Sequence, residues 1–222
     1  FPQLLGDSQA SIQFSKDCAK LQCFIDNMSK PVVAALNGMA LGGGLEVAIR
    51  CHKIVALKDI NIQLPEISLG ILPGIGGCVV PYRRWPEGAP LFHEMITLGK
   101  AINSQKAKEI GMVTEIADSF PELIKIAIKE INNYQGGLPS VIDGPAKIPA
   151  FHNLENPMSG KLSLSKEAVK VTVNTIIEGA AANSLSEALE IGYKGFGTIA
   201  CTAAAKEGIT AFLEKRKPEF KG

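Results

Sequence analysis

The sequence lacks both a marked excess of one charge and a long uninterrupted apolar run. Its 222 residues include 23 Lys and Arg side chains against 22 Asp and Glu, so the net charge is +1. This balance gives no reason to expect a nucleic acid or a membrane surface as a partner. The most apolar stretch, Val32 to Ile49, contains Asn37, four glycines and Glu46. It is typical of a buried strand, a turn and a helix rather than of a membrane span.

Cysteine is also scarce, and no C-x-x-C pair occurs. The cysteines are odd in number and widely spaced: Cys18, Cys23, Cys51, Cys78 and Cys201. This argues against a disulfide framework or a zinc site and favours a reducing compartment. No signal-peptide pattern opens the sequence. We therefore predict a cytoplasmic protein without a bound metal.

The remaining composition is ordinary for a soluble globular protein. Hydrophobic residues make up 46% and charged residues 20%, which argues against disorder. The length suits one large domain, or one domain with a helical appendage. The chain opens on Phe1 and Pro2 without Met and enters a helical pattern directly. We therefore expect the sequence to be a fragment of a longer chain.

The apolar pattern predicts an α/β fold with a helical C-terminal part. The first predicted strand is expected to be fully buried in a parallel sheet. The predicted strands are 32–36, 53–57, 61–64 and 113–116. The predicted helices are 8–28, 45–50, 89–98, 104–110, 121–132, 166–178, 184–196 and 201–215. Residues 1–134 are predicted as the core, 135–164 as a loop or linker, and 165–222 as the helical region.

Individual side chains predict how helices begin and which way they face. Ser104 is expected to cap the helix that it opens. Ser184 and Ser186 are both candidates to cap a later helix, and Glu187 lies three residues after Ser184, as in a capping box. Leu21 and Phe24 are among the apolar positions that make the first helix amphipathic.

The turn Gly42-Gly43-Gly44 follows a predicted strand and opens a helix. Glycine allows a sharp turn and a close approach by another group, and free amides at a helix N-terminus favour negative charge. A phosphate loop is excluded because no Gly-Lys-Ser/Thr follows, and the dinucleotide pattern G-x-G-x-x-G is absent. Two interpretations remain at this point, a small oxyanion site and a plain tight turn.

Two glutamates lie in otherwise apolar surroundings beside turns. Glu46 follows the glycines, where it either complements the helix dipole or serves a site. Glu66 follows Pro65 at the end of a predicted strand, and a solvated turn residue is the alternative there. If the two carboxylates converge on one small site, their environments would separate their pKa values and fit them for acid and base roles.

Four segments resemble those of the enoyl-CoA hydratase/isomerase (crotonase) family, in the same order. Residues 30–46, Lys-Pro-Val-Val-Ala-Ala-Leu-Asn-Gly-Met-Ala-Leu-Gly-Gly-Gly-Leu-Glu, resemble its first signature. Residues 64–77, Leu-Pro-Glu-Ile-Ser-Leu-Gly-Ile-Leu-Pro-Gly-Ile-Gly-Gly, resemble its second. Residues 102–113 resemble the segment before its C-terminal helices, and residues 206–218 resemble its C-terminus. The resemblance implies a crotonase-like ββα spiral with a C-terminal helical region of the trimerisation type.

The same resemblance implies addition of water to an enoyl-CoA, with no cofactor because coenzyme A is part of the substrate. Gly43 would donate its N–H to the thioester oxygen, Glu46 would hold and activate water, and Glu66 would give the proton to Cα. The positions implied to contact substrate are Leu41, Gly42, Leu72, Pro73, Gly74, Phe212 and Lys215. Of these, Phe212 and Lys215 match positions that in family oligomers reach a CoA bound mainly by a neighbouring subunit.

The sequence also departs from the family pattern. The family's second oxyanion donor comes from an upstream Gly-Ala-Asp type motif, which is absent, so N-terminal strands are expected to be missing. Where relatives carry a polar Thr-Gln-Arg, this chain has Arg83, Arg84 and Trp85 near a Cys-Val-Val-Pro-Tyr run. We interpret these three residues as a surface loop, with the path of the CoA phosphates as the alternative.

Segment 135–164 and the final Lys-Arg-Lys-Pro-Glu-Phe-Lys-Gly resemble fused proteins that also carry a 3-hydroxyacyl-CoA dehydrogenase domain. The predicted partners are therefore an acyl-CoA and either further copies of the chain, as a trimer or hexamer, or a fused dehydrogenase domain.

The presence of both glutamates favours hydration over an isomerase or hydrolase variant of the family. Two competing hypotheses are a non-catalytic acyl-CoA-binding or oligomerisation module and a serine peptidase of the same superfamily. The peptidase would need a Ser near the glycine turn and a partnered His.

Overall fold

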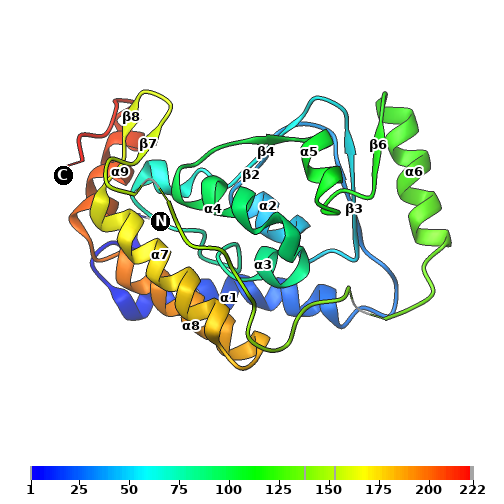
Figure 1. The fold of residues 1–222 in the computed structure, drawn as a ribbon, viewed down its shortest axis with the longest axis horizontal. Coiled ribbons are helices and arrows are strands. Elements are labelled where there is room, and N and C mark those ends of the chain that lie inside the picture. The colour runs from blue at the N-terminus through cyan, green and yellow to red at the C-terminus, as the bar shows by residue number, and fades with distance from the viewer. Residues whose placement is uncertain (1, 138, 153, 221–222) are drawn as a thin grey trace.

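The computed structural model describes residues 2–137, 139–152 and 154–220 and has the predicted α/β architecture (Figure 1). Phe1 and the predicted chain end at Lys221 and Gly222 lie outside the described residues. One sheet is parallel, in the order β1-β3-β6: β1 Val33–Leu36, β3 Lys53–Leu57 and β6 Glu115–Ala117. A second sheet has the order β2-β4-β5: β2 Ala40–Leu41, β4 Asn61–Gln63 and β5 Ile102–Asn103. In it β2 runs parallel to β4, and β5 runs antiparallel.

Helices and short 3-10 turns connect and cover these sheets. The helices are α1 Ser8–Asp26, α2 Gly43–Ala48, α3 Val80–Arg84, α4 Ala89–Thr97, α5 Ser104–Glu109, α6 Phe120–Asn132, α7 Lys166–Ala181, α8 Leu185–Ile199 and α9 Ala203–Leu213. The 3-10 turns are η1 Pro2–Leu4, η2 Glu66–Leu69 and η3 Pro86–Gly88. A small antiparallel hairpin, β7 Met158–Ser159 and β8 Leu162–Ser163, precedes α7. After α1, short strands, turns and short helices come first, and the helices α7, α8 and α9 follow at the C-terminal end, as the sequence predicts.

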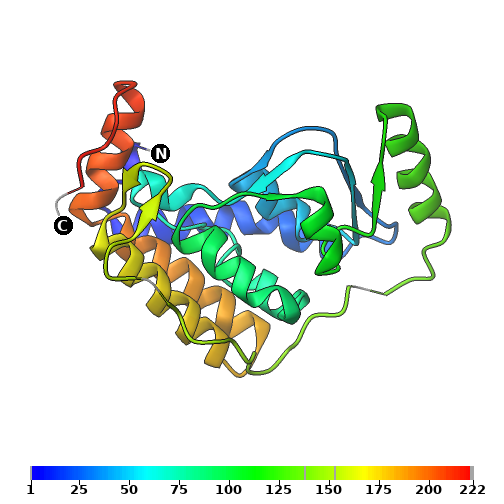
Figure 2. The same ribbon diagram turned by 45° about the horizontal axis from the view of Figure 1, so that its top comes forward.

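Helix α8 lies between α1 and α7 and packs against both (Figures 1 and 2). A Cβ on Gly197 of α8 would lie 2.8 Å from the carbonyl oxygen of Ser8, so the two helix backbones approach closely. The Phe14 and Phe196 rings stack across the same contact, with their centroids 6.5 Å apart. This contact fixes α1 to the helical layer.

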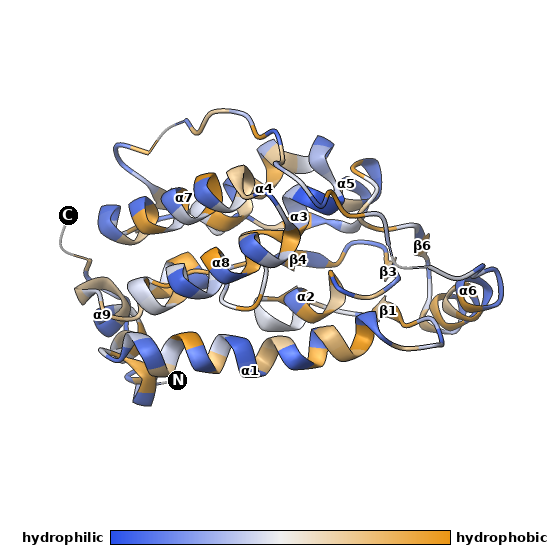
Figure 3. Ribbon diagram, turned by 90° about the horizontal axis from the view of Figure 1, so that it is seen from below, coloured by the Kyte–Doolittle hydropathy of each residue, from blue (hydrophilic) through white to orange (hydrophobic). Residues whose placement is uncertain are grey.

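The inward face of α1 differs from the predicted one. Leu21 and Phe24 are exposed at 52% and 66%, whereas the buried residues of the helix are Ser11, Ser15, Ala19, Gln22 and Ile25. Polar and apolar residues alternate along α1 rather than forming one apolar stripe (Figure 3). Small inward side chains suit the close approach of α8, and Ser11 satisfies its hydroxyl by donating to the carbonyl oxygen of Leu4.

Three further local expectations are wrong. Strand β1 is not fully buried, because its residues are half-buried or exposed. Asn103 rather than Ser104 caps α5, since the Asn103 side chain accepts from the Lys106 N–H. Arg83, Arg84 and Trp85 do not form a surface loop.

These three residues lie at the end of α3 and beyond it, with Arg83 and Trp85 buried. Arg83 donates to the carbonyl oxygens of Gly179 and Ala182, at 2.8 and 3.1 Å, and also to those of Ile142 and Gly144. It therefore connects segment 139–146 to the end of α7. Ser184 caps α8 as predicted, because its hydroxyl accepts from the Glu187 N–H at 3.1 Å. The Glu187 carboxylate accepts from the Asn183 N–H at 2.8 Å, one residue before the cap, and not from Ser184 as a capping box requires.

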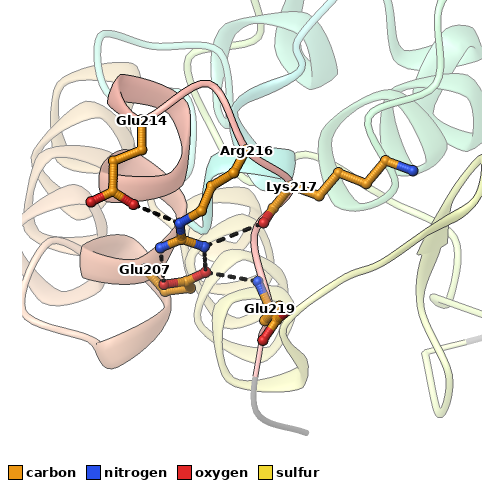
Figure 4. A network of polar contacts seen from close by, with 5 residues as sticks. All are labelled: Glu207, Glu214, Arg216, Lys217 and Glu219. Carbon is orange, nitrogen blue, oxygen red and sulfur yellow. Dashed lines mark hydrogen bonds and ion pairs between the residues drawn. The ribbon is translucent and has the colours of Figure 1, made fainter.

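The segment after α9 is held by an exposed polar network (Figure 4). Arg216 donates to both carboxylate oxygens of Glu207, at 2.6 and 2.9 Å, and to Glu214 at 2.6 Å. Glu207 also accepts from the Glu219 N–H at 2.7 Å. The hydrogen bonds from Arg216 and from the Glu219 amide lower the pKa of Glu207 to about 2. The network folds residues 216–219 back along α9.

Helix α9 in turn packs directly against η2, with glycines on both sides of the contact. A Cβ on Gly208 would lie 2.1 Å from the carbonyl oxygen of Leu69, and one on Gly70 would lie 2.4 Å from that of Ala204. Gly70 also has φ +68°, in the left-handed region that favours glycine. Backbone packs against backbone here, so neither glycine can gain a side chain without moving η2 or α9.

Replacing Gly208 by Ala is therefore expected to destabilise the protein by about 2 kcal/mol, because the methyl group would overlap the backbone of η2. The matched control is Gly179→Ala in α7, where the nearest atom to an added Cβ is Val79 Cγ2 at 3.5 Å. That change should be neutral or stabilising by up to about 1 kcal/mol. Urea unfolding of both variants checks this, and equal stability of the two would contradict it.

Candidate active site

Glu46 projects from α2, just after the glycine turn. Gly42 precedes α2 with φ +52° and ψ −131°, a conformation that residues with a Cβ rarely adopt. The Glu46 side chain is nearly inaccessible, at 3% exposure. Its Oε1 accepts hydrogen bonds from the Ile75 N–H at 2.9 Å and the Gly77 N–H at 2.8 Å. The loop that follows η2 therefore holds this carboxylate with two backbone amides.

Glycine at position 77 is needed for this contact. A Cβ on Gly77 would lie 3.1 Å from Glu46 Oε1 and 2.6 Å from Pro73 Cβ. The loop must approach the carboxylate this closely for its amides to donate to it. The two glycine-rich segments of the sequence thus meet at Glu46.

Glu66 opens η2, directly after Pro65. Its Oε2 is buried and has no hydrogen-bond partner within the described part of the chain. Its Oε1 lies against the glycine turn, 2.7 Å from where a Cβ on Gly42 would stand. Gly42 therefore provides the left-handed turn and also leaves room for the Glu66 carboxyl group.

Both glutamates line one cleft of about 470 Å³. Among the other predicted positions, Gly43, Leu72 and Gly74 also line it. Gly43 is the first residue of α2, so its N–H has no acceptor within the helix. Leu41, Gly42 and Pro73 are not among the described residues that line the cleft, although Gly42 and Pro73 are chain neighbours of residues that do. The convergence of the two carboxylates, left open by the sequence, is present.

Phe212 and Lys215 lie elsewhere, at the exposed end of α9. Neither lines the cleft that holds the two glutamates. Their predicted contact with a CoA bound to a neighbouring subunit remains a prediction.

The two carboxyl groups have different electrostatic surroundings. Burial raises the pKa of Glu46 to about 7, while the amides of Gly77 and Ile75 oppose that rise. Burial, reinforced by the nearby charge of Glu46, raises the pKa of Glu66 to about 8. Within the described residues Glu66 accepts from no amide of another segment, so it holds its proton more strongly than Glu46. Near neutral pH the pair can therefore keep one proton, placed on Glu66.

Sequence reasoning did not anticipate several residues of the cleft wall. Phe14, Asp17, Cys18 and Leu21 of α1 and Phe196 of α8 also line it. A Cβ on Gly74 would lie 2.7 Å from the Phe196 ring, so this ring packs on the loop that holds Glu46. For the α1 residues, the apolar spacing of the sequence predicted a helix. This spacing does not show against which part of the fold the helix packs.

A larger hollow of about 540 Å³ lies away from this cleft, between the start of β3, the end of α3 and the end of α6. Among the described residues that line it, Glu130 is the one acidic side chain, so this hollow offers no second carboxylate pair.

Within the described residues, no group of three or more His, Cys, Asp or Glu side chains is placed to hold a metal ion. No helix of the described chain is long and apolar enough to span a bilayer.

The fold and the cleft together define a protein of the crotonase type. The enoyl-CoA hydratase/isomerase family matches residues 4–141. A probable enoyl-CoA hydratase of Bacillus subtilis (strain 168) is 30% identical over 224 residues, covering 100% of this chain and 74% of that protein. The 2,3-dehydroadipyl-CoA hydratase of Escherichia coli (strain K12) is 32% identical over 206 residues, covering 92% and 66%. The chain belongs to the enoyl-CoA hydratase/isomerase family.

Solved structures share the fold. An enoyl-CoA hydratase from Mycobacterium avium subsp. paratuberculosis K-10 superposes with a TM-score of 0.63 at 21% identity, covering 95% of this chain and 73% of that one. A carnitinyl-CoA hydratase from Mycobacterium avium gives 0.58 at 23%, covering 89% and 65%. The peroxisomal bifunctional enzyme of Cavia porcellus is 43% identical over 105 residues, which is 46% of this chain and 14% of that protein. The chain thus spans 66% of the Escherichia coli relative and a far smaller share of the bifunctional one.

The raised pKa of Glu66 predicts a loss of stability at higher pH. The folded protein keeps a proton there that the unfolded chain releases near its ordinary pKa of 4.5. The stabilisation that this proton gives the folded protein is complete below pH 4.5. Above it, this part of the free energy of unfolding falls by up to about 1.4 kcal/mol per pH unit and is lost once the pH has risen through about 8. In Glu66→Gln the free energy of unfolding should therefore fall less between about pH 5 and about pH 8 than in the wild type.

Urea unfolding at the two pH values measures this difference, with Glu155→Gln, an exposed glutamate, as the control. Identical pH dependence in the wild type and Glu66→Gln would show that Glu66 is ionised in the folded protein throughout this range.

Proposed function

We propose that the protein adds water reversibly across the 2,3 double bond of an enoyl-CoA. The observation that carries this proposal is the pair of buried carboxyl groups in one cleft, beside the N–H of Gly43 at the start of α2. Glu46 accepts from two amides of the loop, whereas Glu66 Oε2 has no partner among the described residues. The names of relatives support the substrate class. They include a 2,3-dehydroadipyl-CoA hydratase and a crotonyl-CoA hydratase from Syntrophomonas wolfei, the latter 32% identical over 201 residues.

The proposed reaction begins with the thioester carbonyl oxygen at the Gly43 N–H. Glu46, with Oε1 fixed by the loop amides, orients a water through its other oxygen and accepts its proton as the C–O bond forms at Cβ. Electrons move from the double bond to the thioester oxygen, which becomes an enolate stabilised by Gly43. Glu66 then gives its proton to Cα, and the enolate collapses to the hydroxyacyl thioester.

The proton balance suits the pair. As the hydroxyacyl product forms, Glu46 gains one proton and Glu66 loses one, so the total charge of the two carboxyl groups does not change. Before the next turnover a proton leaves Glu46 and one returns to Glu66, by exchange with water. The raised pKa of Glu66 keeps its proton available near neutral pH, and the amides on Glu46 favour its ionised form. The reaction as written needs no further cofactor.

A double-bond isomerase is the nearest alternative within the family. Moving a double bond requires removal and return of a proton, for which one carboxyl group is sufficient. Both carboxyl groups here face the same cleft, and this second carboxylate favours hydration. A non-catalytic acyl-CoA-binding module is the alternative of another class, and absence of turnover with intact binding would identify it.

CoA binding and assembly involve residues outside the cleft. We propose that Phe212 and Lys215, both exposed near the end of α9, contact a CoA bound to a neighbouring subunit. We also propose that the chain acts as a homo-oligomer or beside a fused dehydrogenase domain. The partial similarity to a peroxisomal bifunctional enzyme supports the second arrangement.

Hydration is measured by the loss of absorbance of crotonyl-CoA. Glu46→Gln and Glu66→Gln should each lower kcat by about 100-fold or more, because each removes a general acid or base. Glu155→Gln, with the same chemical change at an exposed site, should retain wild-type activity. A wild-type protein that hydrates nothing, or full activity in both cleft variants, would overturn the proposal.

A further inference from the structure

Behind Glu46 lies the buried amide side chain of Gln22, on α1. Only 1% of Gln22 is exposed. Its Nε2 donates a 3.0 Å hydrogen bond to the main-chain carbonyl oxygen of Glu46. A buried amide costs free energy unless it is hydrogen-bonded, so this polar side chain needs a specific partner in the core. The partner is the backbone of the residue that carries the carboxylate.

The Glu46 carbonyl needs such a donor because α2 is short. In a continuing α-helix the Arg50 N–H would donate to the Glu46 oxygen. Instead it donates to Val47 at 3.1 Å, and the Ile49 N–H donates to Leu45 at 2.9 Å. Gln22 thus supplies from α1 the hydrogen bond that Arg50 does not make.

The other end of the Gln22 amide faces the loop that binds the Glu46 carboxylate. Its Oε1 lies 3.6 Å from where a Cβ on Gly76 would stand. Gly76 is the residue between Ile75 and Gly77, whose amides donate to Glu46 Oε1. One side chain therefore lies against both the helix that carries the carboxylate and the loop that holds it.

Helix α1 is a suitable support for this contact. One turn beyond Gln22, Asp26 pairs with Arg50, which is four residues beyond Glu46. Near the middle of α1, six residues before Gln22, Lys16 pairs with Glu190 of α8 at 2.8 Å. Gln22 therefore projects from a helix that is fixed on both sides.

We propose that Gln22 is a positioning residue for Glu46, holding α2 at the distance from the 72–77 loop at which Glu46 Oε1 receives both amides. As far as turnover is concerned, this inference rests on the proposed hydration. Gln22 lies outside the residues that line the cleft and acts only through Glu46.

The test is Gln22→Met, which keeps the length and burial of the side chain but removes the hydrogen bond. The expected result is a kcat about tenfold lower with KM changed less than about twofold. The acidic limb of the pH profile of kcat should also move to higher pH. With weaker hydrogen bonds from the Ile75 and Gly77 amides, the Glu46 carboxyl group holds its proton more strongly. The titratable groups that interact with Glu46, namely Glu66, Cys18, Cys78 and Tyr193, are unchanged in this variant.

Two further variants separate positioning from general packing. Gln105→Met makes the same change on the exposed face of α5 and should match the wild type. Asp26→Asn weakens the other contact between α1 and the end of α2. It should lower the urea midpoint without moving the pH profile. A folded Gln22→Met with wild-type kcat and pH profile would overturn the inference, as would an equal shift of the pH profile in Asp26→Asn.

A measurement without turnover keeps this inference separate from the proposed function. Carboxyl-13C NMR of Glu46, assigned with Glu46→Gln, should titrate at higher pH in Gln22→Met than in the wild type. An inactive wild type would overturn the hydration proposal but leave this titration as the test of Gln22. An unchanged Glu46 titration in an active protein would overturn the role of Gln22 alone.

Discussion

The structure depends on how a buried carboxylate, Glu46, is accommodated. Removing a carboxylate from water is costly unless hydrogen bonds replace its hydration. Here the replacement comes from the Ile75 and Gly77 amides, which reach Oε1 only because Gly77 has no side chain. The glycine turn on one side and the Gly/Pro loop on the other are therefore two halves of one contact. Strands β2 and β4 run parallel and bring those halves to the same edge.

The same arrangement separates the properties of the two carboxyl groups. Glu66 shares the burial of Glu46 but lacks amides from another segment, and the charge of Glu46 raises its pKa further. Helix α9 packs against η2, backbone to backbone, and so supports the turn that carries Glu66. The helical C-terminal part thus helps to shape the cleft even though its own residues, apart from Phe196, do not line it. These contacts raise the pKa of both carboxyl groups, and that of Glu66 more than that of Glu46.

Much of the fold could be predicted from sequence because its signals are local. Short apolar runs indicated β1, β3 and β4, with Pro31 and Asn37 on either side of the first, and the glycine turn indicated the start of α2. The inward face of α1 could not be predicted, because close packing against Gly197 of α8 selects small and polar residues over Leu21 and Phe24. Arg83 likewise has a charged side chain typical of a surface, yet its Nη1 and Nη2 donate to carbonyl groups of distant segments in the core. The convergence of Glu46 and Glu66 was a hypothesis until the tertiary structure brought them to one cleft.

In the proposed reaction an acyl thioester lies between these two carboxyl groups with its carbonyl oxygen at Gly43. A crystal structure of the protein with butyryl-CoA, a saturated acyl thioester that cannot be hydrated, tests this directly. We expect the thioester oxygen within hydrogen-bond distance of the Gly43 N–H, Cα facing Glu66, and a water bound to Glu46 near Cβ. A thioester bound in the hollow beside Glu130, or one whose carbonyl oxygen points away from Gly43, would contradict it.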